Sequence, residues 1–244
     1  MPKIFKVGGS VRDELLGVHS KDIDFTFVLD ILDKTVEEGF QEMTEWMLEK
    51  GFEIFLSTPD CFTIRAKFPK SSENEKLIAD FVMARKEIGY IKGTRKPILA
   101  LGTLEDDLIR RDFTLNAMAR DEAGNLIDLF GGVDDLKSKI LKTPLDPRIT
   151  MMDDPLRILR SWRFSITKGF IIDPSILEAI KQPGILEKLE STVSGERIRE
   201  ELFKMFKHDT IESLKLLNDM ESHIPGLMKM IFKNGLHLEP SFKH

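Results

Sequence analysis

The chain has 244 residues, a formal net charge of −5, 41% hydrophobic and 32% charged residues, and one cysteine. This length and composition predict a folded protein with a substantial core, built as one large domain or as two or three small ones. The single cysteine, Cys61, excludes an internal disulfide framework and a multi-cysteine zinc site. The acidic net charge does not exclude a nucleic-acid partner, because such binding depends on local basic patches.

The sequence contains no candidate for a membrane-spanning segment. No apolar run reaches the roughly 18 residues that a membrane span requires. The first ten residues, MPKIFKVGGS, lack the apolar core of a secretory signal. We therefore expect a cytoplasmic protein that does not insert into a membrane.

Short β-type runs alternate with helical ones over the first 130 residues. Strands are predicted at residues 4–7, 25–29, 52–56, 62–68, 77–83 and 126–130. Between them, residues 34–50 carry Phe40, Met43 and Met47 at helical spacing. From about Ile149 onward the apolar residues follow a helical period instead. The chain is therefore predicted to be an α+β domain followed by a helical one.

Three segments are predicted to be irregular. Residues 70–76 form a polar hairpin tip, and residues 85–102 contain glycines, a proline and several cations, which favours a long loop. This loop is either a mobile element that helps to organise a site or a plain solvated connection. The helical part is expected to end soon after Met220, and residues 234–244 are expected to form a frayed tail.

Two glycines mark the junction between the first predicted strand and the helix that follows it. Gly8 and Gly9 would let backbone N–H groups approach a phosphate at the start of a helix. A tight turn without a ligand, with Ser10 as the helix cap, is the alternative.

Three acidic residues suggest a metal site. Asp22 and Asp24 are two positions apart, so in an extended chain they point to the same face, where two carboxylates repel each other unless a cation lies between them. Asp80 lies within the otherwise apolar run 77–83, and an acid there is costly unless it is paired or binds a cation. Mg²⁺ takes one or two carboxylates together with substrate phosphates, and a third acid would complete a two-metal site. Solvated strand edges are the alternative for all three residues.

Several motifs in order carry a resemblance to a known family. The segments GGSVRDELLG and DID resemble motif A of class II tRNA nucleotidyltransferases and bacterial poly(A) polymerases. RRDFTLNAMA (residues 110–119) resembles their motif B, and DDPLRILRSWRF (residues 153–164) resembles their nucleotide-selecting motif D. The resemblance runs from residue 3 to residue 206, where VSGERIREELFKMF is similar to the helix that closes the neck.

The resemblance implies an architecture and an activity. The fold would be α+β, with a polymerase-β-type nucleotidyltransferase head of a small mixed sheet and helices at residues 1–140. An all-α neck for nucleotide selection would follow at 141–207, and a short body at 208–244. The activity would be template-independent addition of C and A to the 3′ end of tRNA from CTP and ATP, with two Mg²⁺ ions.

The resemblance also implies roles for individual residues. Asp22 and Asp24 would hold the metals, and Asp80 would help to activate the RNA 3′-OH. The residues implied in nucleotide binding are Gly8, Gly9, Arg12, Arg111, Asp112, Asn116, Asp154, Arg157, Arg160 and Arg163. Asp153 stands where the family usually has Glu, which we expect to change only how motif D is braced.

Asp154 and Arg157 are expected to read the incoming base as a pair on one helix face. A carboxylate only accepts and a guanidinium only donates. Cytosine and adenine offer an amine beside an unprotonated ring nitrogen, whereas uracil and guanine offer a carbonyl beside an N–H. The pair would therefore accept C and A. In the alternative, Asp154 caps a helix that has Pro155 at its first position.

Other functions stay open at this level. Poly(A) polymerases of the family usually carry a Gly-Arg-Arg-Phe-type signature, and residues 63–68 read TIRAKF here, which favours CCA addition. An enzyme that adds only CC or only A is a further alternative, and an inactive RNA-binding module is the alternative of another class. Few residues follow the neck, so a partner chain or a homo-oligomer could supply further tRNA-binding surface.

Overall fold

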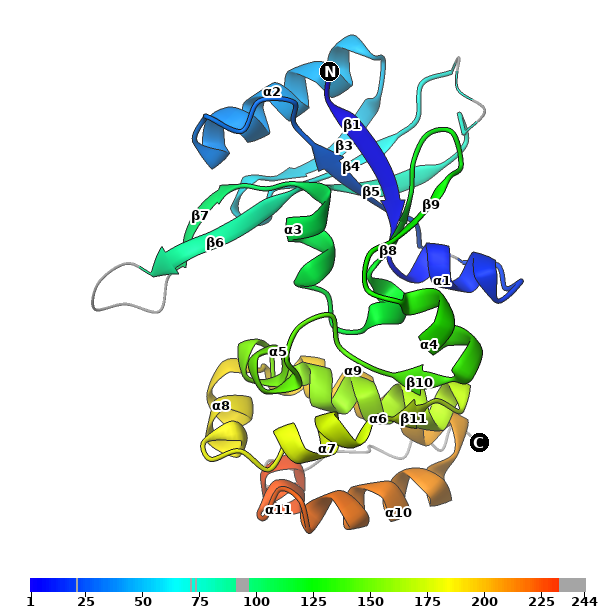
Figure 1. Cartoon of the computed structure of the whole chain (residues 1–244), viewed down its shortest axis with the longest axis vertical. Coiled ribbons are helices and arrows are strands. Elements are labelled where there is room, and N and C mark those ends of the chain that lie inside the picture. Colours follow the sequence, from blue (N-terminus) through cyan, green and yellow to red (C-terminus); the bar gives the residue numbers. More distant parts are fainter. Residues whose placement is uncertain (21, 71, 73, 91–96, 233–244) are drawn as a thin grey trace, which may run out of the picture. The chain divides into compact units, whose positions relative to one another are not determined.

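The computed structural model describes residues 1–20, 22–70, 72, 74–90 and 97–232, and the chain divides into two compact units, Met1–Val133 and Asp134–His244 (Figure 1). The division into residues 1–140, 141–207 and 208–244 stays a prediction. None of the described helices has the length and apolar character needed to cross a membrane.

A mixed sheet of seven strands forms the centre of the first unit, in the order β3-β4-β5-β2-β1-β8-β9. The strands are β1 (Lys3–Val7), β2 (Asp24–Val28), β3 (Glu53–Thr58), β4 (Thr63–Lys67), β5 (Ile78–Met83), β8 (Met118–Arg120) and β9 (Leu126–Asp128). Only β2 and β5 run parallel to each other, and the other pairs are antiparallel. All six predicted strands are present. Residues 70–76 connect the antiparallel strands β4 and β5, as the predicted hairpin tip requires, although residues 71 and 73 lie outside the described residues.

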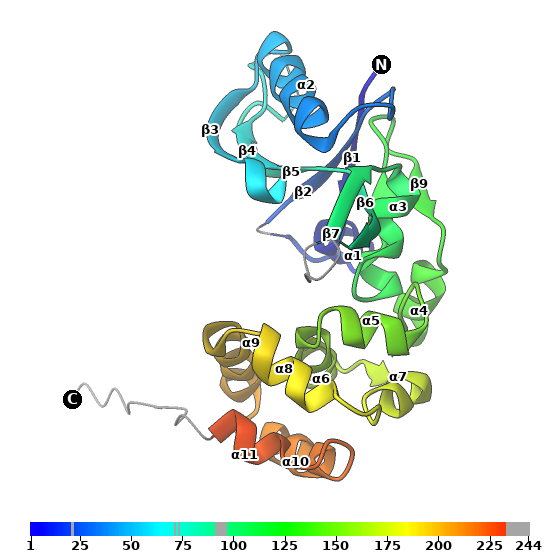
Figure 2. The same ribbon diagram turned by 90° about the vertical axis from the view of Figure 1, so that its left-hand side faces the viewer.

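Helix α2 (Val36–Glu49) covers one face of this sheet (Figure 2). It begins with a capping box, in which the Thr35 hydroxyl accepts from the Glu38 N–H and the Glu38 carboxylate accepts from the Thr35 N–H. Met43 and Met47, one turn apart, are fully buried against the aromatic side chains of the sheet. Each such side chain contributes about 1.5–3 kcal/mol when it leaves water.

The other face of the sheet carries a smaller core and the shorter elements. Leu108 of α3 (Leu104–Ile109) is fully buried there with Val7, Ala117 and Ala119. Helix α1 (Gly9–Leu15) follows β1, and two 3₁₀ turns, η1 (Pro59–Cys61) and η2 (Thr114–Asn116), complete the unit before α4 (Gly132–Ser138) begins. Asp24, which is in register with Val7, belongs to this face.

The long loop predicted at residues 85–102 is wrong for the described part of that segment. Strands β6 (Arg85–Tyr90) and β7 (Pro97–Leu101) form an antiparallel two-stranded sheet with a bulge between Glu87 and Gly89 (Figure 1). The glycines and the proline break the alternation that marks a strand, while the pairing depends on the opposite strand. A Cβ on Gly102 would lie 2.8 Å from the Arg85 carbonyl carbon, so this glycine serves a close backbone crossing. Residues 91–96 lie outside the described residues.

The second unit is helical, as predicted, with one addition. Its helices are α5 (Pro147–Asp153), α6 (Leu156–Lys168), α7 (Pro174–Ala179), α8 (Ile185–Thr192), α9 (Gly195–His208), α10 (Thr210–Glu221) and α11 (Leu227–Phe232). Helices α6 and α9 pack side by side, burying Trp162, Leu202 and Met205 (Figure 2). The addition is a short parallel pair of β10 (Ile140–Leu141) and β11 (Ile171–Ile172).

The expectation that the helical part ends soon after Met220 is wrong, because α11 follows α10. Pro225 and Gly226, which has a φ of 90°, interrupt the helical period and concealed this helix in the sequence. The Glu221 carboxylate accepts from the N–H groups of Gly226 and Met228 at 2.7 Å, which satisfies backbone donors at the start of the new helix. The predicted tail, residues 234–244, lies outside the described residues.

Candidate active site

The turn between β1 and α1 places Gly8 at a conformation that other residues rarely adopt. Its φ is 74° and its ψ is −138°. A Cβ added to Gly8 would lie 2.7 Å from Nη1 of Arg111, so the guanidinium lies directly against the turn. Ser10 is not the helix cap: its buried hydroxyl donates to the Val7 carbonyl at 3.0 Å. Gly8 therefore allows the close approach of Arg111, while Gly9 faces Arg12, with a built Cβ 3.4 Å from its Nη2. A role of these glycines in binding phosphate stays a prediction.

A buried polar network joins α1 to the segment that precedes β8. Arg12, 7% exposed, donates through Nη1 to the Asn116 amide oxygen at 2.6 Å and through Nη2 to Asp13 at 2.7 Å. The Asn116 amide nitrogen donates to Asp112 at 2.9 Å, and the same carboxylate accepts from the Phe113 N–H at 2.8 Å. The structure thus brings the expected nucleotide-binding residues Arg12, Asp112 and Asn116 together. In this arrangement Asn116 links the other two side chains, because it accepts from Arg12 and donates to Asp112.

The three predicted acids lie close together, near the sheet face opposite to α2. Asp24 begins β2 and is in register with Asp80 on the parallel neighbour β5, while Asp22 lies just before β2. Burial raises the pKa of Asp24. Arg111 opposes this shift, and the negative charges of Asp80 and Asp22 add to it. Asp80 also forms an ion pair with Arg65 at 3.5 Å. The acids are therefore close enough to repel one another, as the sequence predicted.

The donor set of this cluster suits a hard divalent cation. The described residues contain no preformed group of three or more His, Cys, Asp or Glu side chains arranged around a metal position. Such a group is not required, since Mg²⁺ keeps several waters and usually binds through one or two carboxylates plus substrate phosphates. Asp22 and Asp24 could hold the ion, and a nucleotide would supply the remaining oxygens.

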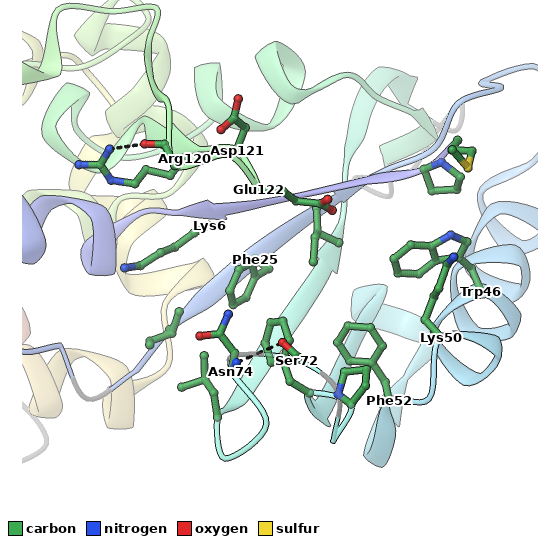
Figure 3. Close-up of a pocket in the computed structure, with 18 of the residues that line it drawn as sticks. Lys6, Phe25, Trp46, Lys50, Phe52, Ser72, Asn74, Arg120, Asp121 and Glu122 are labelled. Atoms are coloured by element: carbon green, nitrogen blue, oxygen red, sulfur yellow. Dashed lines mark hydrogen bonds between the residues drawn. The ribbon is translucent and has the colours of Figure 1, made fainter.

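A hollow of about 690 Å³ lies on the face of the sheet opposite to Asp24 (Figure 3). Phe25, Trp46 and Lys50 line it, together with Lys6 and Arg120. Side chains alternate along a strand, so Phe25 points away from the face that carries Asp24. This hollow is therefore separate from the site formed by Asp22, Asp24 and Asp80.

In the second unit, Asp154 and Arg157 lie at the junction of α5 and α6. Asp154 has an extended backbone outside both helices, so it does not share a helix with Arg157. Its carboxylate accepts from the Leu156 N–H at 3.1 Å, which resembles the capping alternative, although Pro155 precedes the helix. Arg157 donates to the Thr150 carbonyl at 3.2 Å and pairs with Asp153 at 3.6 Å. Asp153 thus braces Arg157.

Two partners of these residues were missed by the sequence reasoning. Arg197 of α9 pairs with the Asp154 carboxylate at 3.2 Å. Glu201, only 5% exposed, forms an ion pair with Arg163 Nε and lies 3.8 Å from Arg160. The expected nucleotide-binding residues Arg160 and Arg163 therefore help to tie α6 to α9. A signal was available, since Glu201 shares a helix face with buried Ile198, Leu202 and Met205, and a buried acid needs a cation.

Comparison with known proteins gives a consistent assignment. The family model described as the poly(A) polymerase head domain matches residues 4–142, more than half of the chain. A multifunctional CCA protein of Nitrosomonas europaea is 39% identical over 183 residues, which cover 74% of this chain and 38% of that protein. The chain spans less than half the length of the curated relatives that it matches.

Solved structures show the same likeness. The Bacillus stearothermophilus CCA-adding enzyme in complex with CTP has a TM-score of 0.70 and 26% identity, over 93% of this chain and 50% of that one. A tRNA nucleotidyltransferase complexed with a primer tRNA and an incoming ATP analogue has a TM-score of 0.64 and 30% identity, over 92% and 60%. By family match, sequence and fold, the chain belongs to the class II tRNA nucleotidyltransferase and poly(A) polymerase family.

Proposed function

We propose that this chain transfers nucleotides from CTP and ATP to the 3′ end of tRNA, completing its CCA end without a nucleic-acid template. The observation that carries the proposal is the pairing of Asp24 with Asp80 across parallel strands, on the sheet face where Thr26 links to Arg111 through Asp107. Carboxylates for a cation thus lie in the same unit as a guanidinium for phosphate, which is the combination that phosphoryl transfer requires.

In this proposal the first unit performs the chemistry. Asp22 and Asp24 hold Mg²⁺, which when bound neutralises charge on the phosphoryl oxygens. Asp80, held by Arg65, accepts a hydrogen bond from the 3′-OH of the RNA and orients it for attack on the α-phosphate. Arg111 donates to the triphosphate beside Gly8, since a guanidinium matches phosphate geometry with two parallel hydrogen bonds.

The second unit selects the base in this proposal. A carboxylate offers about four acceptor sites, so Asp154 can accept from an exocyclic amine while it remains bonded to Leu156 and Arg197. Arg157 then donates to the unprotonated ring nitrogen of cytosine or adenine. Uracil and guanine present an N–H to this guanidinium and a carbonyl to this carboxylate, so both contacts become repulsive.

The decisive experiment supplies single nucleotides with tRNAs that end before CC, before A, or with a complete CCA. A CCA-adding enzyme extends the first by CC when CTP is supplied and the second by A when ATP is supplied, and it leaves the third unchanged with either nucleotide. Addition of A to all three identifies a poly(A) polymerase, and a single partial addition identifies a CC- or A-adding enzyme. Binding without extension identifies an inactive module. The Asp24→Ala protein, purified in the same way, controls for contaminating enzymes.

A further inference from the structure

Asp107 on α3 connects the strand that carries the metal acids to the arginine beside Gly8. Its Oδ2 accepts from the Thr26 hydroxyl at 2.8 Å and from Arg111 Nη2 at 2.9 Å. The side chains of Asp107 and Arg111 are 18% and 22% exposed, so this ion pair is largely shielded from water. No motif considered in the sequence assigned a role to Asp107 or Thr26.

Arg111 has two carboxylates within its electrostatic reach. Thr26 is two positions after Asp24 on β2, so its side chain points to the same face as Asp24. The Nη2 of Arg111, bonded to Asp107, lies 3.5 Å from the Thr26 hydroxyl, so the guanidinium lies on the strand face that carries Asp24. Without the bond to Asp107, Arg111 could form an ion pair with Asp24 instead. That ion pair would compete with a cation for the Asp24 carboxylate.

The remaining donors of Arg111 are directed by its bond to Asp107. Nη1 lies against Gly8, and the buried Nε–H has no acceptor in the part of the chain that the structure describes. A buried donor without a partner is costly, so this guanidinium still has hydrogen-bonding capacity that its described neighbours do not use. The hydrogen bond from Nη2 to Asp107 therefore keeps Nη1 at the Gly8 turn, where it can contact an anionic ligand.

Helix α3 does not need Asp107 for its own stability. Its start is closed by a capping box between Thr103 and Asp106, with the reciprocal hydrogen bonds at 3.2 and 2.8 Å. Its attachment to the sheet comes from Leu108, which is fully buried, and from the hydrogen bond between Thr26 and Asp107. This attachment does not account for the ion pair that the same carboxylate forms with Arg111.

We propose that Asp107 is a positioning residue: it holds Arg111 on the Gly8 turn for the triphosphate and keeps it from occupying Asp24, so that Asp24 stays available to the cation. This inference rests on the proposed function for the identity of the two ligands. Thr26 orients the Asp107 carboxylate by donating its hydroxyl hydrogen.

The test compares Asp107→Asn with Glu105→Gln, which removes the same charge from an exposed position of the same helix. In the tRNA extension assay, Asp107→Asn should raise the Mg²⁺ concentration for half-maximal rate about tenfold, which corresponds to about 1.4 kcal/mol. It should raise KM for CTP and ATP equally, because both share the triphosphate. Glu105→Gln should change neither value.

The second arm removes the competitor. Adding Arg111→Ala to Asp107→Asn should return the Mg²⁺ requirement to that of Arg111→Ala alone, which a merely structural defect would not do. Mn²⁺ affinity, followed by electron paramagnetic resonance without RNA, should show the same pattern, so the inference is tested even if the chain extends no RNA. An unchanged Mn²⁺ affinity in Asp107→Asn, or a defect that persists without Arg111, overturns the proposal.

Discussion

Gly8→Ala tests whether the turn after β1 is built for the close approach of Arg111. With φ at 74° and ψ at −138°, Gly8 occupies a region that is nearly exclusive to glycine, and a side chain there costs about 1–3 kcal/mol. The lower entropy of the unfolded alanine chain offsets under about 1 kcal/mol of this cost. At about 2–4 °C per kcal/mol for a chain of this size, the remaining cost should lower Tm by up to about 10 °C.

The same substitution should also displace Arg111. The new Cβ would lie 2.7 Å from Nη1, which is closer than real Cβ contacts, and the guanidinium is held by Asp107 at 2.9 Å. Arg111 must therefore leave its position, at the cost of a charge-assisted hydrogen bond to phosphate of about 1.5–3 kcal/mol. We expect KM for CTP and ATP to rise by roughly ten- to a hundredfold.

Substitutions at Gly17 and Gly9 distinguish the cost of a strained backbone from the displacement of Arg111 by a new side chain. Gly17 has a φ of 69° with nothing within 4 Å of a built Cβ, so Gly17→Ala should lower Tm without changing KM. Gly9 has no positive φ, and its Cβ would lie 3.4 Å from Arg12 Nη2, so Gly9→Ala should leave Tm close to wild type. Differential scanning calorimetry and steady-state kinetics measure both effects. A Gly8→Ala protein with wild-type KM would refute the placement of Arg111 at the phosphate.

Three further predictions concern the acids and base choice. Asp22→Ala or Asp24→Ala should abolish nucleotide transfer while circular dichroism stays native, because a metal ligand is lost from a mutually repelling group. Burial raises the pKa of Asp24, so the metal-free fold loses stability as the pH rises from the ordinary pKa of an aspartate to the raised one, and the full loss is present above the raised value. Metal-free Asp24→Asn should therefore have a higher Tm than wild type at pH 7 and the same Tm as wild type near pH 3, where the Asp24 carboxyl of the wild type is protonated in the folded and the unfolded state alike; a gap that widens on acidification would contradict the sign. Arg157→Ala should reduce the preference for CTP and ATP over UTP and GTP by roughly ten- to a hundredfold, measured by single-nucleotide incorporation with Arg148→Ala as the charge-matched control. A retained preference in Arg157→Ala would make this arginine structural.

The strands of the first unit could be predicted because their pattern is local. Phe25 and Phe27 alternate with Asp24 and Thr26, so the sequence itself separates the buried face from the polar one. The helix at residues 34–50 was equally visible from Phe40, Met43 and Met47. By contrast, β6 and β7 pair with each other across residues 91–96, and glycine and proline remove the alternation. Their pairing depends on the opposite strand and is not visible in either run alone.

The acids of the site were predictable for a similar reason, and their partners were not. Asp22, Asp24 and Asp80 stand out because carboxylates are unexpected beside apolar strands. Arg12 and Asn116 are 104 positions apart and meet only in the folded chain. A motif therefore predicts which residues gather, whereas the acceptor that each donor finds is decided by tertiary structure.

The arginines of α6 also have partners that the sequence did not reveal. Arg157, Arg160 and Arg163 recur every three residues and were expected to act together on a nucleotide. In the fold, Arg163 and Arg160 face Glu201, an acid too buried to remain without a cation. Removing either arginine would therefore weaken the attachment of α6 to α9 as well as any contact with a ligand. Since Arg197 of the same α9 holds Asp154, a change in base preference on mutating Arg163 would report on helix placement, and only Arg157 tests base reading directly.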